Sequence, residues 1–410
     1  MPTTLTYFMK HIFILLFCLF TYTSFAQIGT CIEVPQGSGN WVRQDGSPCD
    51  PPLITVVPFL RIAPDARSTG MGNVGLATSA DVNSMNFNAS KYSFSEKEGG
   101  IALNVVPWLR NLGLTDIYLA YLSGYYKFDK MQAVAASVRY FSLGEFTFTD
   151  LNRNVIGTGH PHEFELAVAY SRKLSDYLSA SLTGKFIYSN LAAGQTTTEG
   201  IDIVSAKTFA VDIGFSYKKP LNTKTKSTLG VGLALTNIGD KIKYTKTYDG
   251  DVLPANIGLG FAWDIDMDEF NRITLGLDFN KLLVPSPSFV DNNNDSIPDY
   301  RQKGVLDGIF GSFSDAIGGG KEELKEILIG FGAEYWYNDL FALRAGYTYE
   351  NPRKGNGRYI TLGMGLKYST FGLGLSYIVP TSNFRNALDN TLRFSIIFDF
   401  GTFKPDKGAQ

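Results

Sequence analysis

The sequence contains few of the residues that enzymes most often use for chemistry, and it lacks long apolar runs. Of its 410 residues three are histidine and three are cysteine, and the 37 basic residues nearly balance the 39 acidic ones. A near-neutral chain offers no broad basic surface, so we expect no nucleic-acid partner. Beyond the first 26 residues no stretch is apolar for long enough to form a membrane-spanning helix, which needs about 20 residues.

The N-terminus has the pattern of a secretory signal peptide. Lys10 precedes an apolar run from Ile12 to Phe20, and the small residue Ala26 follows a few positions later. A run of about nine residues is too short to span a bilayer as a helix. We therefore assign residues 1–26 to a cleaved signal peptide. Cys18 leaves a lipoprotein as the alternative, which its position inside the apolar run disfavours.

Residues 27–57 are expected to form a periplasmic N-terminal arm. This segment is rich in proline, glycine and serine, and it holds Cys31 and Cys49, the two cysteines that remain after signal cleavage. Exported proteins meet an oxidising environment, so the pair favours a disulfide. Two free thiols in an unstructured arm are the alternative.

From about residue 101 onward, large apolar residues alternate with small or polar ones. In one segment Phe209, Val211 and Ile213 alternate with Ala210 and Asp212. A period of two is typical of a strand with one apolar face, and an amphipathic helix cannot produce it. Since lipid offers no partner to backbone groups, a membrane protein without helices must close its strands into a barrel.

Fourteen segments follow this pattern. They span roughly 101–108, 116–128, 131–142, 162–172, 177–189, 206–218, 228–237, 255–265, 271–280, 327–336, 341–349, 359–368, 371–379 and 391–400. Their connections are mostly long after odd-numbered segments and short after even-numbered ones, as expected for long outer loops and short periplasmic turns.

The sequence thus predicts an all-β fold, a 14-stranded antiparallel transmembrane β-barrel in a bacterial outer membrane. The barrel covers residues 101–403, and a polar tail follows at 404–410. The alternative is a large soluble β-sandwich, whose strands would bury the same apolar faces. A sandwich, however, has no need to sort its loops by side.

Residues 58–100 do not follow the strand pattern and are predicted to plug the lumen. Their glycines permit tight backbone packing, and a ring of fourteen strands is too wide for its own side chains to fill. The charged plug residues are Arg61, Asp65, Arg67 and Asp81. We expect them to pair with lumen charges such as Asp212, Asp278, Glu334 and Arg344.

One stretch of the plug resembles a known family. Its sequence is Phe59-Leu60-Arg61-Ile62-Ala63-Pro64-Asp65-Ala66-Arg67-Ser68-Thr69-Gly70-Met71-Gly72. It resembles the opening signature of the PorV/PorQ proteins of Bacteroidetes, which are relatives of the FadL barrels. Together with the strand count and the long outer loops, the resemblance extends over nearly the whole mature chain. The chain departs from the family at Asn88-Ala89-Ser90-Lys91, where the usual pattern is Asn-Pro-Ala-Lys.

The resemblance implies a FadL-like barrel with a role in the type IX secretion system. Such barrels bind the C-terminal signal domain of cargo at the translocon, which contains a SprA-type barrel. They then carry the cargo to the attachment machinery, which contains a PorU-type sortase. Outer-membrane lipid and lipopolysaccharide would surround the protein. The same fold also permits a FadL-like transporter of hydrophobic small molecules, because fold does not fix function.

The longest outer loop carries a possible partner-binding stripe. Leu306, Ile309, Phe310, Phe313 and Ile317 fall at the spacing of an amphipathic helix. We expect this stripe either to cap the barrel mouth or to contact cargo or a partner barrel.

The same loop resembles a calcium-binding sequence. Asp291, Asn293, Asp295 and Asp299 occupy positions 1, 3, 5 and 9 of a pattern in which alternate oxygen ligands converge. Ser296 replaces the usual glycine, and no glutamate stands at position 12. A polar loop without metal is therefore the alternative, and we expect no other cofactor.

An outer-membrane esterase or protease is the rival class of protein. His160 and His162 are the histidines left after signal cleavage, and Glu163 follows them. Neither a serine elbow nor a metal-ligand cluster accompanies them, so we expect no enzyme.

Overall fold

The computed structural model describes residues 32–33, 41–42, 46 and most of 50–401. The gaps within 50–401 are 110–113, 115, 150–151, 197–199, 222–225, 247–249, 289, 293–296, 356 and 382–390. Among the described residues, no helix is both long enough and apolar enough to cross a bilayer.

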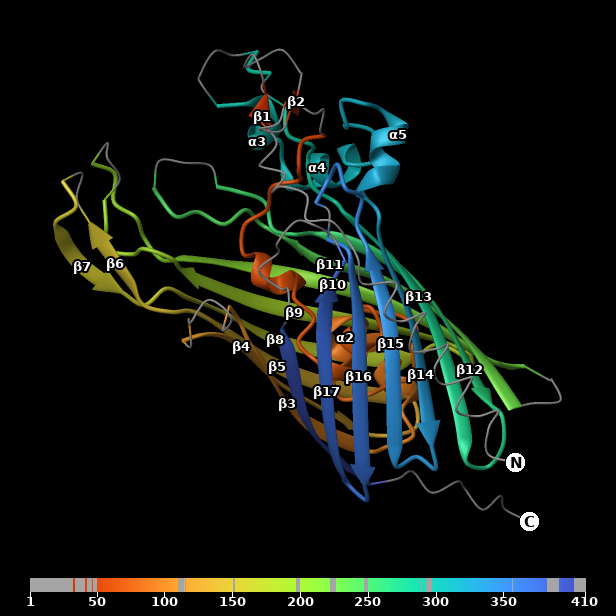
Figure 1. Cartoon of the computed structure of the whole chain (residues 1–410). Helices are drawn as coiled ribbons and strands as arrows, with labels where there is room; N and C mark the ends of the chain where they lie inside the picture. Colours follow the sequence, from red (N-terminus) through yellow and green to blue (C-terminus); the bar gives the residue numbers. More distant parts are fainter. Residues whose placement is uncertain are drawn as a thin grey trace, which may run out of the picture.

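Fourteen strands close into one antiparallel barrel (Figure 1). They are β3 (Gly99–Pro107), β4 (Ile117–Lys127), β5 (Gln132–Leu143), β8 (His162–Lys173), β9 (Leu178–Asn190), β10 (Ala206–Leu221), β11 (Lys226–Gly239), β12 (Asn256–Asp266), β13 (Asn271–Leu282), β14 (Leu328–Tyr337), β15 (Phe341–Tyr349), β16 (Tyr359–Tyr368), β17 (Phe371–Pro380) and β18 (Leu392–Phe400). Each barrel strand pairs with the next along the chain, and β18 pairs with β3 to close the ring. Each of the fourteen predicted segments overlaps one of these strands, so the predicted fold class is confirmed.

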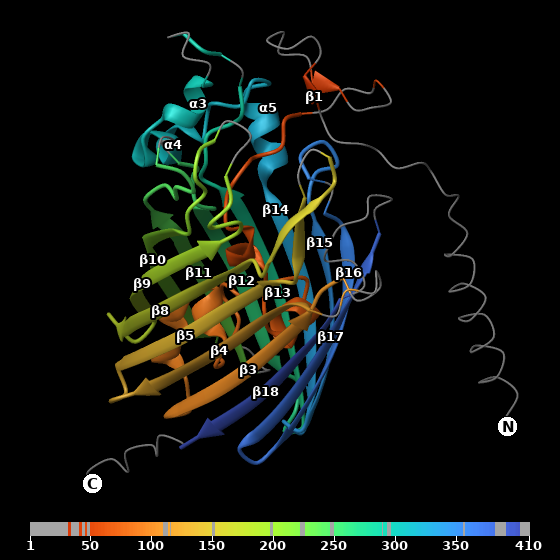
Figure 2. The same ribbon diagram turned by 90° about the vertical axis from the view of Figure 1, so that its left-hand side faces the viewer.

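The two faces of each strand differ as the alternation predicts. On β4 the side chains of Leu119 and Tyr121 are buried inside the barrel, whereas Tyr118 and Leu122 are exposed on its outer surface. Successive side chains of a strand point to opposite faces. The exposed apolar side chains therefore face lipid, and the buried side chains line the lumen. The strands tilt strongly against the barrel axis (Figure 2).

Two small sheets lie outside the barrel and were not predicted. The hairpin of β6 (Phe146–Thr149) and β7 (Val155–Gly159) extends from the β5–β8 connection, and β1 (Ile32–Glu33) pairs with β2 (Trp41–Val42). Both sheets lie toward the end of the barrel that carries the long loops (Figure 1), which we call the outer end.

The β13–β14 connection is the longest outer loop. It contains α3 (Asp299–Gln302), α4 (Val305–Gly311), α5 (Gly320–Glu323) and the 3-10 turn η5 (Leu324–Glu326). The helix predicted over 306–317 is wrong in length, because α4 ends at Gly311. Glycine is a poor helix former, and Gly308 and Gly311 weaken helix formation here.

The plug lies inside the barrel (Figure 2). It consists of η1 (Pro58–Arg61), α2 (Ala66–Gly70), η2 (Ser84–Asn86) and η3 (Ala89–Phe94), joined by irregular chain. Helix α2 contacts β15 to β18, and η3 contacts β4, β5 and β8 to β10. The plug thus bridges opposite walls of the ring.

The chain enters the plug from the outer end. The carboxylate of Asp50 pairs with Lys325 and Arg353, both in outer loops, at 2.7 and 2.8 Å. The backbone N–H of Val56 donates to the carbonyl of Val252, also in an outer loop. The periplasmic placement of the 27–57 arm is therefore wrong for residues 50–57. Cys31 and Cys49 lie outside the described residues, so their disulfide stays a prediction.

Candidate functional site

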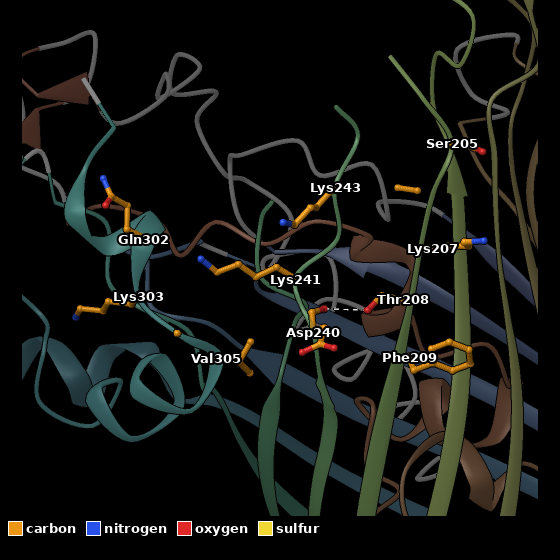
Figure 3. A pocket seen from close by; sticks show the side chains of 12 residues that line it. Ser205, Lys207, Thr208, Phe209, Asp240, Lys241, Lys243, Gln302, Lys303 and Val305 are labelled. Carbon is orange, nitrogen blue, oxygen red and sulfur yellow. Dashed lines mark hydrogen bonds between the residues drawn. The ribbon is translucent and has the colours of Figure 1, made fainter. Parts of the chain in front are cut away.

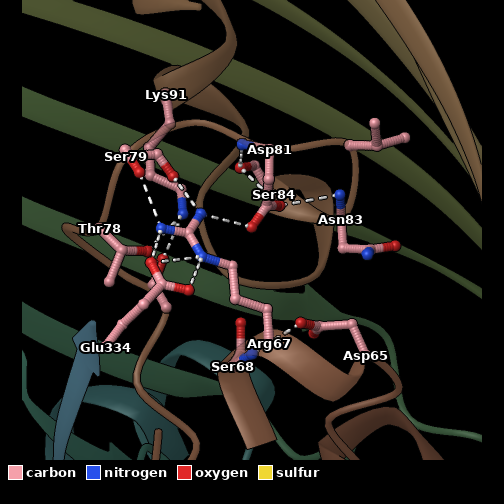
Figure 4. A network of polar contacts seen from close by, with 12 residues as sticks. Asp65, Arg67, Ser68, Thr78, Ser79, Asp81, Asn83, Ser84, Lys91 and Glu334 are labelled. Atoms are coloured by element: carbon pink, nitrogen blue, oxygen red, sulfur yellow. Dashed lines mark hydrogen bonds and ion pairs between the residues drawn. The ribbon is translucent and has the colours of Figure 1, made fainter. Parts of the chain in front are cut away.

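A charged network joins the plug to the barrel wall (Figure 4). The guanidinium of Arg67 on α2 contacts Asp81 of the plug at 2.9 Å and Glu334 of β14 at 2.8 Å. Arg344 of β15 contacts the same Glu334 carboxylate at 2.6 Å. The network therefore balances two guanidinium groups with two carboxylates inside the lumen.

The lumen wall also holds the plug by its backbone. One carboxylate oxygen of Asp278 on β13 accepts hydrogen bonds from the N–H groups of Gly75 and Leu76 at 2.7 and 2.9 Å. Arg139 of β5 donates to the carbonyl of Leu60 at 2.9 Å. These contacts satisfy backbone groups of an irregular segment that has no sheet of its own.

The remaining predicted plug and lumen charges have other surroundings. Asp65 caps the start of α2 by accepting a hydrogen bond from the N–H of Ser68. Asp212 pairs with Lys185 of the neighbouring strand at 2.7 Å instead of with the plug. Arg61 is exposed and forms no ion pair with any lumen charge in the described part of the chain.

An apolar cluster seals the lumen near its outer end. Phe59, Leu60 and Ile62 of the plug are buried in a core with Leu119 and Phe141 of the wall. The rings of Phe59 and Phe141 stack with their centroids 6.3 Å apart. The sequence signal for this seal was the apolar run at the start of the plug. The sequence analysis predicted roles for the charged plug residues and none for this run.

The outer loop presents an exposed apolar surface. The predicted stripe is split, because Ile309 is buried against Leu283 and Ala255, whereas its other members face solvent. We call the exposed residues of the stripe, together with the exposed Leu324 of η5, the outer apolar surface. Its members are Leu306, Phe310, Phe313, Ile317 and Leu324, which are between 51% and 74% exposed.

A buried ion network fixes the base of this surface. The ammonium group of Lys354 contacts Glu322 at 2.6 Å and Glu326 at 2.9 Å. Lys281 at the outer end of β13 contacts Glu323 at 2.7 Å and Glu326 at 2.5 Å. Because all five side chains are largely buried, the loop is joined to the barrel by charges that water screens poorly. The run of charges after residue 320 was the sequence signal for this network.

The predicted calcium loop is only partly described. Asp299 accepts a hydrogen bond from the backbone N–H of Asn292 at 3.2 Å, as in a polar turn. Asn293 and Asp295 lie outside the described residues, and Asp291 lies at the edge of that gap. Calcium binding therefore stays a prediction.

The histidine pair is not assembled into a catalytic site. The ring of His162 lies between Tyr140 and Tyr188 in an aromatic band on the outer surface, with centroids 6.0 and 5.9 Å away. Glu163 points into the lumen, where Ser189 donates to it at 2.7 Å. Neighbouring residues of a strand face opposite ways, so the sequence proximity of this acid and base is misleading.

A model of the family described as type IX secretion system protein PorV matches residues 50–289 of this chain. The chain belongs to the PorV family. The match covers residues 50–57, the plug and the barrel as far as β13. This PorV-family barrel is an outer-membrane component of the type IX secretion system. A comparison with curated proteins found no match.

Solved structures similar to this PorV-family chain are FadL-like barrels. The toluene transporter TodX of Pseudomonas putida is 12% identical with a TM-score of 0.50, over 82% of this chain and 98% of TodX. The toluene transporter TbuX of Ralstonia pickettii is 12% identical with a TM-score of 0.46, over 82% and 98%. A FadL homologue of Pseudomonas aeruginosa is 11% identical with a TM-score of 0.43, over 86% and 100%. At 12% identity the likeness to TodX shows the fold alone.

Proposed function

We propose that this PorV-family barrel binds the C-terminal signal domain of secreted cargo and carries it to the cell-surface attachment machinery. Family membership supports the general role in type IX secretion. The finer steps would involve a SprA-type translocon barrel as the donor of cargo and a PorU-type sortase as the recipient.

The observation that carries this proposal is an exposed apolar surface above a sealed lumen. Five large apolar side chains face solvent on the longest outer loop. Contiguous exposed apolar groups are costly in water and mark places where proteins meet. The ion network of Lys354 and Lys281 holds this surface in place before a partner arrives, which lowers the cost of ordering it on binding.

The same features argue against passive transport of small hydrophobic molecules as the main role. Two of the similar structures are described as toluene transporters. In this chain, however, Phe59 and Leu60 fill the outer lumen, and the Arg67–Glu334 contact ties the plug to the wall behind them. A permeating molecule would have to displace both.

The test replaces Phe310 and Phe313 with serine and measures cargo in the medium and in the periplasm. We expect less cargo in the medium and more in the periplasm, with the barrel still assembled in the outer membrane. The matched control is the double variant Phe128→Ser, Phe270→Ser, whose rings are exposed at periplasmic turns. Normal secretion by the loop variant, with the barrel folded, would contradict the proposal. Loss of hydrophobic uptake with secretion intact would favour the transporter.

A further inference from the structure

A cavity of about 690 Å³ lies beneath the outer loops, beside the outer end of β10 (Figure 3). Its walls come from β10, from the segment after β11 and from the α3–α4 region of the long loop. The β10 residues that line the cavity come from both faces of the strand: Lys207 and Phe209 point outward, whereas Ala206 and Thr208 are buried toward the lumen. The cavity therefore lies at the outer rim of the barrel wall, and Lys207 and Phe209 belong to its outward side.

The lining of the cavity is strongly positive. It includes Lys207, Lys241, Lys243 and Lys303, and Asp240 is its single acidic residue among the described ones. Lys303 contacts Asp315 outside the cavity at 3.1 Å. Lys207 and Lys243 form no ion pair with any residue in the part of the chain that the structure describes. The ammonium group of Lys241 donates to the carbonyl of Arg301, so Lys207 and Lys243 are the lysines whose charge would attract an anion here.

The position of the cavity sets the class of anion. Phe209 is 70% exposed and packs on Phe186, with ring centroids 5.3 Å apart, within an aromatic band on the outer surface of β4 to β10. Aromatic side chains near strand ends lie at the level of the lipid headgroups. Lys207 is two residues nearer the outer end, about 7 Å along the strand. Its charge therefore lies where the phosphates of the outer leaflet are found.

We infer that this cavity binds the phosphorylated headgroup of an outer-leaflet lipid. The ammonium groups of Lys207 and Lys243 donate to the phosphate oxygens, and Lys241 and Lys303 add positive charge around them. Acyl chains of the lipid lie against Phe209 below. The volume is within the range of about 300–1,000 Å³ that ligand sites usually have. The site would anchor one lipid beneath the loop that carries the outer apolar surface.

The test uses the full-length barrel purified in detergent and measures binding of diphosphoryl lipid A by native mass spectrometry. The double variant Lys207→Gln, Lys243→Gln should weaken binding about tenfold or more, because two charged hydrogen-bond donors are lost. The matched control is Lys219→Gln, Lys226→Gln. It removes two exposed lysines from the periplasmic ends of β10 and β11 and should bind as the unaltered protein does.

Two further probes separate the possible sources of phosphate. Lipid A stripped of its phosphates should bind no better to the unaltered protein than to the double variant, and inorganic pyrophosphate should compete only weakly because it lacks acyl chains. Equal binding of diphosphoryl lipid A by the unaltered protein and the double variant would overturn the inference. Full competition by pyrophosphate at concentrations equal to those of the lipid would overturn the assignment to a lipid.

Discussion

The guanidinium of Arg67 and the carboxylate of Glu334 join the plug to the barrel wall, with Nη2 of Arg67 2.8 Å from Oε1 of Glu334. The variant Arg67→Met removes this contact and leaves Asp81 without its ion-pair partner. We expect it to lower the free energy of unfolding by about 3–5 kcal/mol, as for other broken buried pairs. Urea unfolding of the barrel in lipid vesicles measures the loss.

The control for Arg67 is Arg272→Ala, which removes an ion pair with Asp339 at an exposed periplasmic turn. Exposed pairs contribute about 0–1 kcal/mol, so this variant should change stability little. Equal effects of the two variants would show that the Arg67 contact does not hold the plug.

Close packing between plug and wall gives a second prediction. A Cβ atom at Gly346 of β15 would stand 2.1 Å from the backbone nitrogen of Gly72. We therefore expect Gly346→Val to displace the plug and cost about 1–3 kcal/mol of stability or more. Gly184→Val is the control, since no heavy atom lies within 4 Å of its added Cβ. Protease digestion of the plug should increase only in the first variant.

The outer loop should loosen when Lys354 is replaced by methionine. Oε1 of Glu322 then loses its ion-pair partner, although Oε2 keeps the N–H of Gly318, and Glu326 keeps only Lys281. Each buried acceptor left unpaired costs about 1–3 kcal/mol. Limited proteolysis should cut the β13–β14 loop faster, while the barrel stays resistant. Lys321→Met, an exposed lysine of α5, is the control. Unchanged cleavage would mean that other contacts hold the loop.

The turn between β12 and β13 should be sensitive to acid. The carboxylate of Asp268 accepts from the N–H groups of Phe270 and Asn271, each at 2.8 Å. The hydrogen bond from Phe270 is the largest cause that lowers the pKa of Asp268. A lowered folded-state pKa means that this contribution to stability is present above the carboxyl's ordinary pKa. It is lost as the pH falls through the folded value.

The Asp268 carboxyl carbon should therefore titrate in NMR below the ordinary aspartate midpoint of about 3.9. The variant Asp268→Asn identifies the signal by removing it. A midpoint at or above the ordinary value would contradict the prediction.

Titration calorimetry tests the predicted binding of calcium to the 291–299 loop. If Asp291, Asn293, Asp295 and Asp299 converge on calcium, titration should release or absorb heat with the unaltered barrel and not with Asp295→Ala. Identical traces for the two proteins would leave the loop as a polar turn.

The strands could be predicted because lipid and lumen impose a period of two on every strand, as in the alternation around Val211. The β6–β7 hairpin was not predicted although Phe146 and Phe148 alternate with threonines, because strands of four and five residues are too short to show a clear period of two. The plug could be predicted as a segment, but its contacts could not. Whether Arg67 pairs with Glu334 or with Asp212 depends on which barrel strands lie beside α2. The local sequence pattern does not determine that arrangement.

Two further errors have physical causes. The spacing of Leu306 to Ile317 predicted a single helix with one apolar face. In the structure the helix ends at Gly311 and the loop turns, so Ile309 is buried while Phe310 is exposed. The arm was placed in the periplasm because an even strand count returns the barrel to that side. The sequence does not indicate whether the chain before Pro58 enters the barrel from its outer end or from its periplasmic end.

Because the chain enters the plug from the outer end of the barrel, it crosses the membrane one more time than the fourteen strands do. Residues 50–57 lie among the outer loops, and β3 begins at the opposite end, so the plug itself traverses the membrane once, inside the ring. It is in effect a fifteenth crossing, made without contact with lipid. The β18–β3 seam must therefore close around a chain already threaded through the ring, or that chain must be drawn through afterwards. On either route, the chain before the plug reaches the outer side through the ring of strands and not around it.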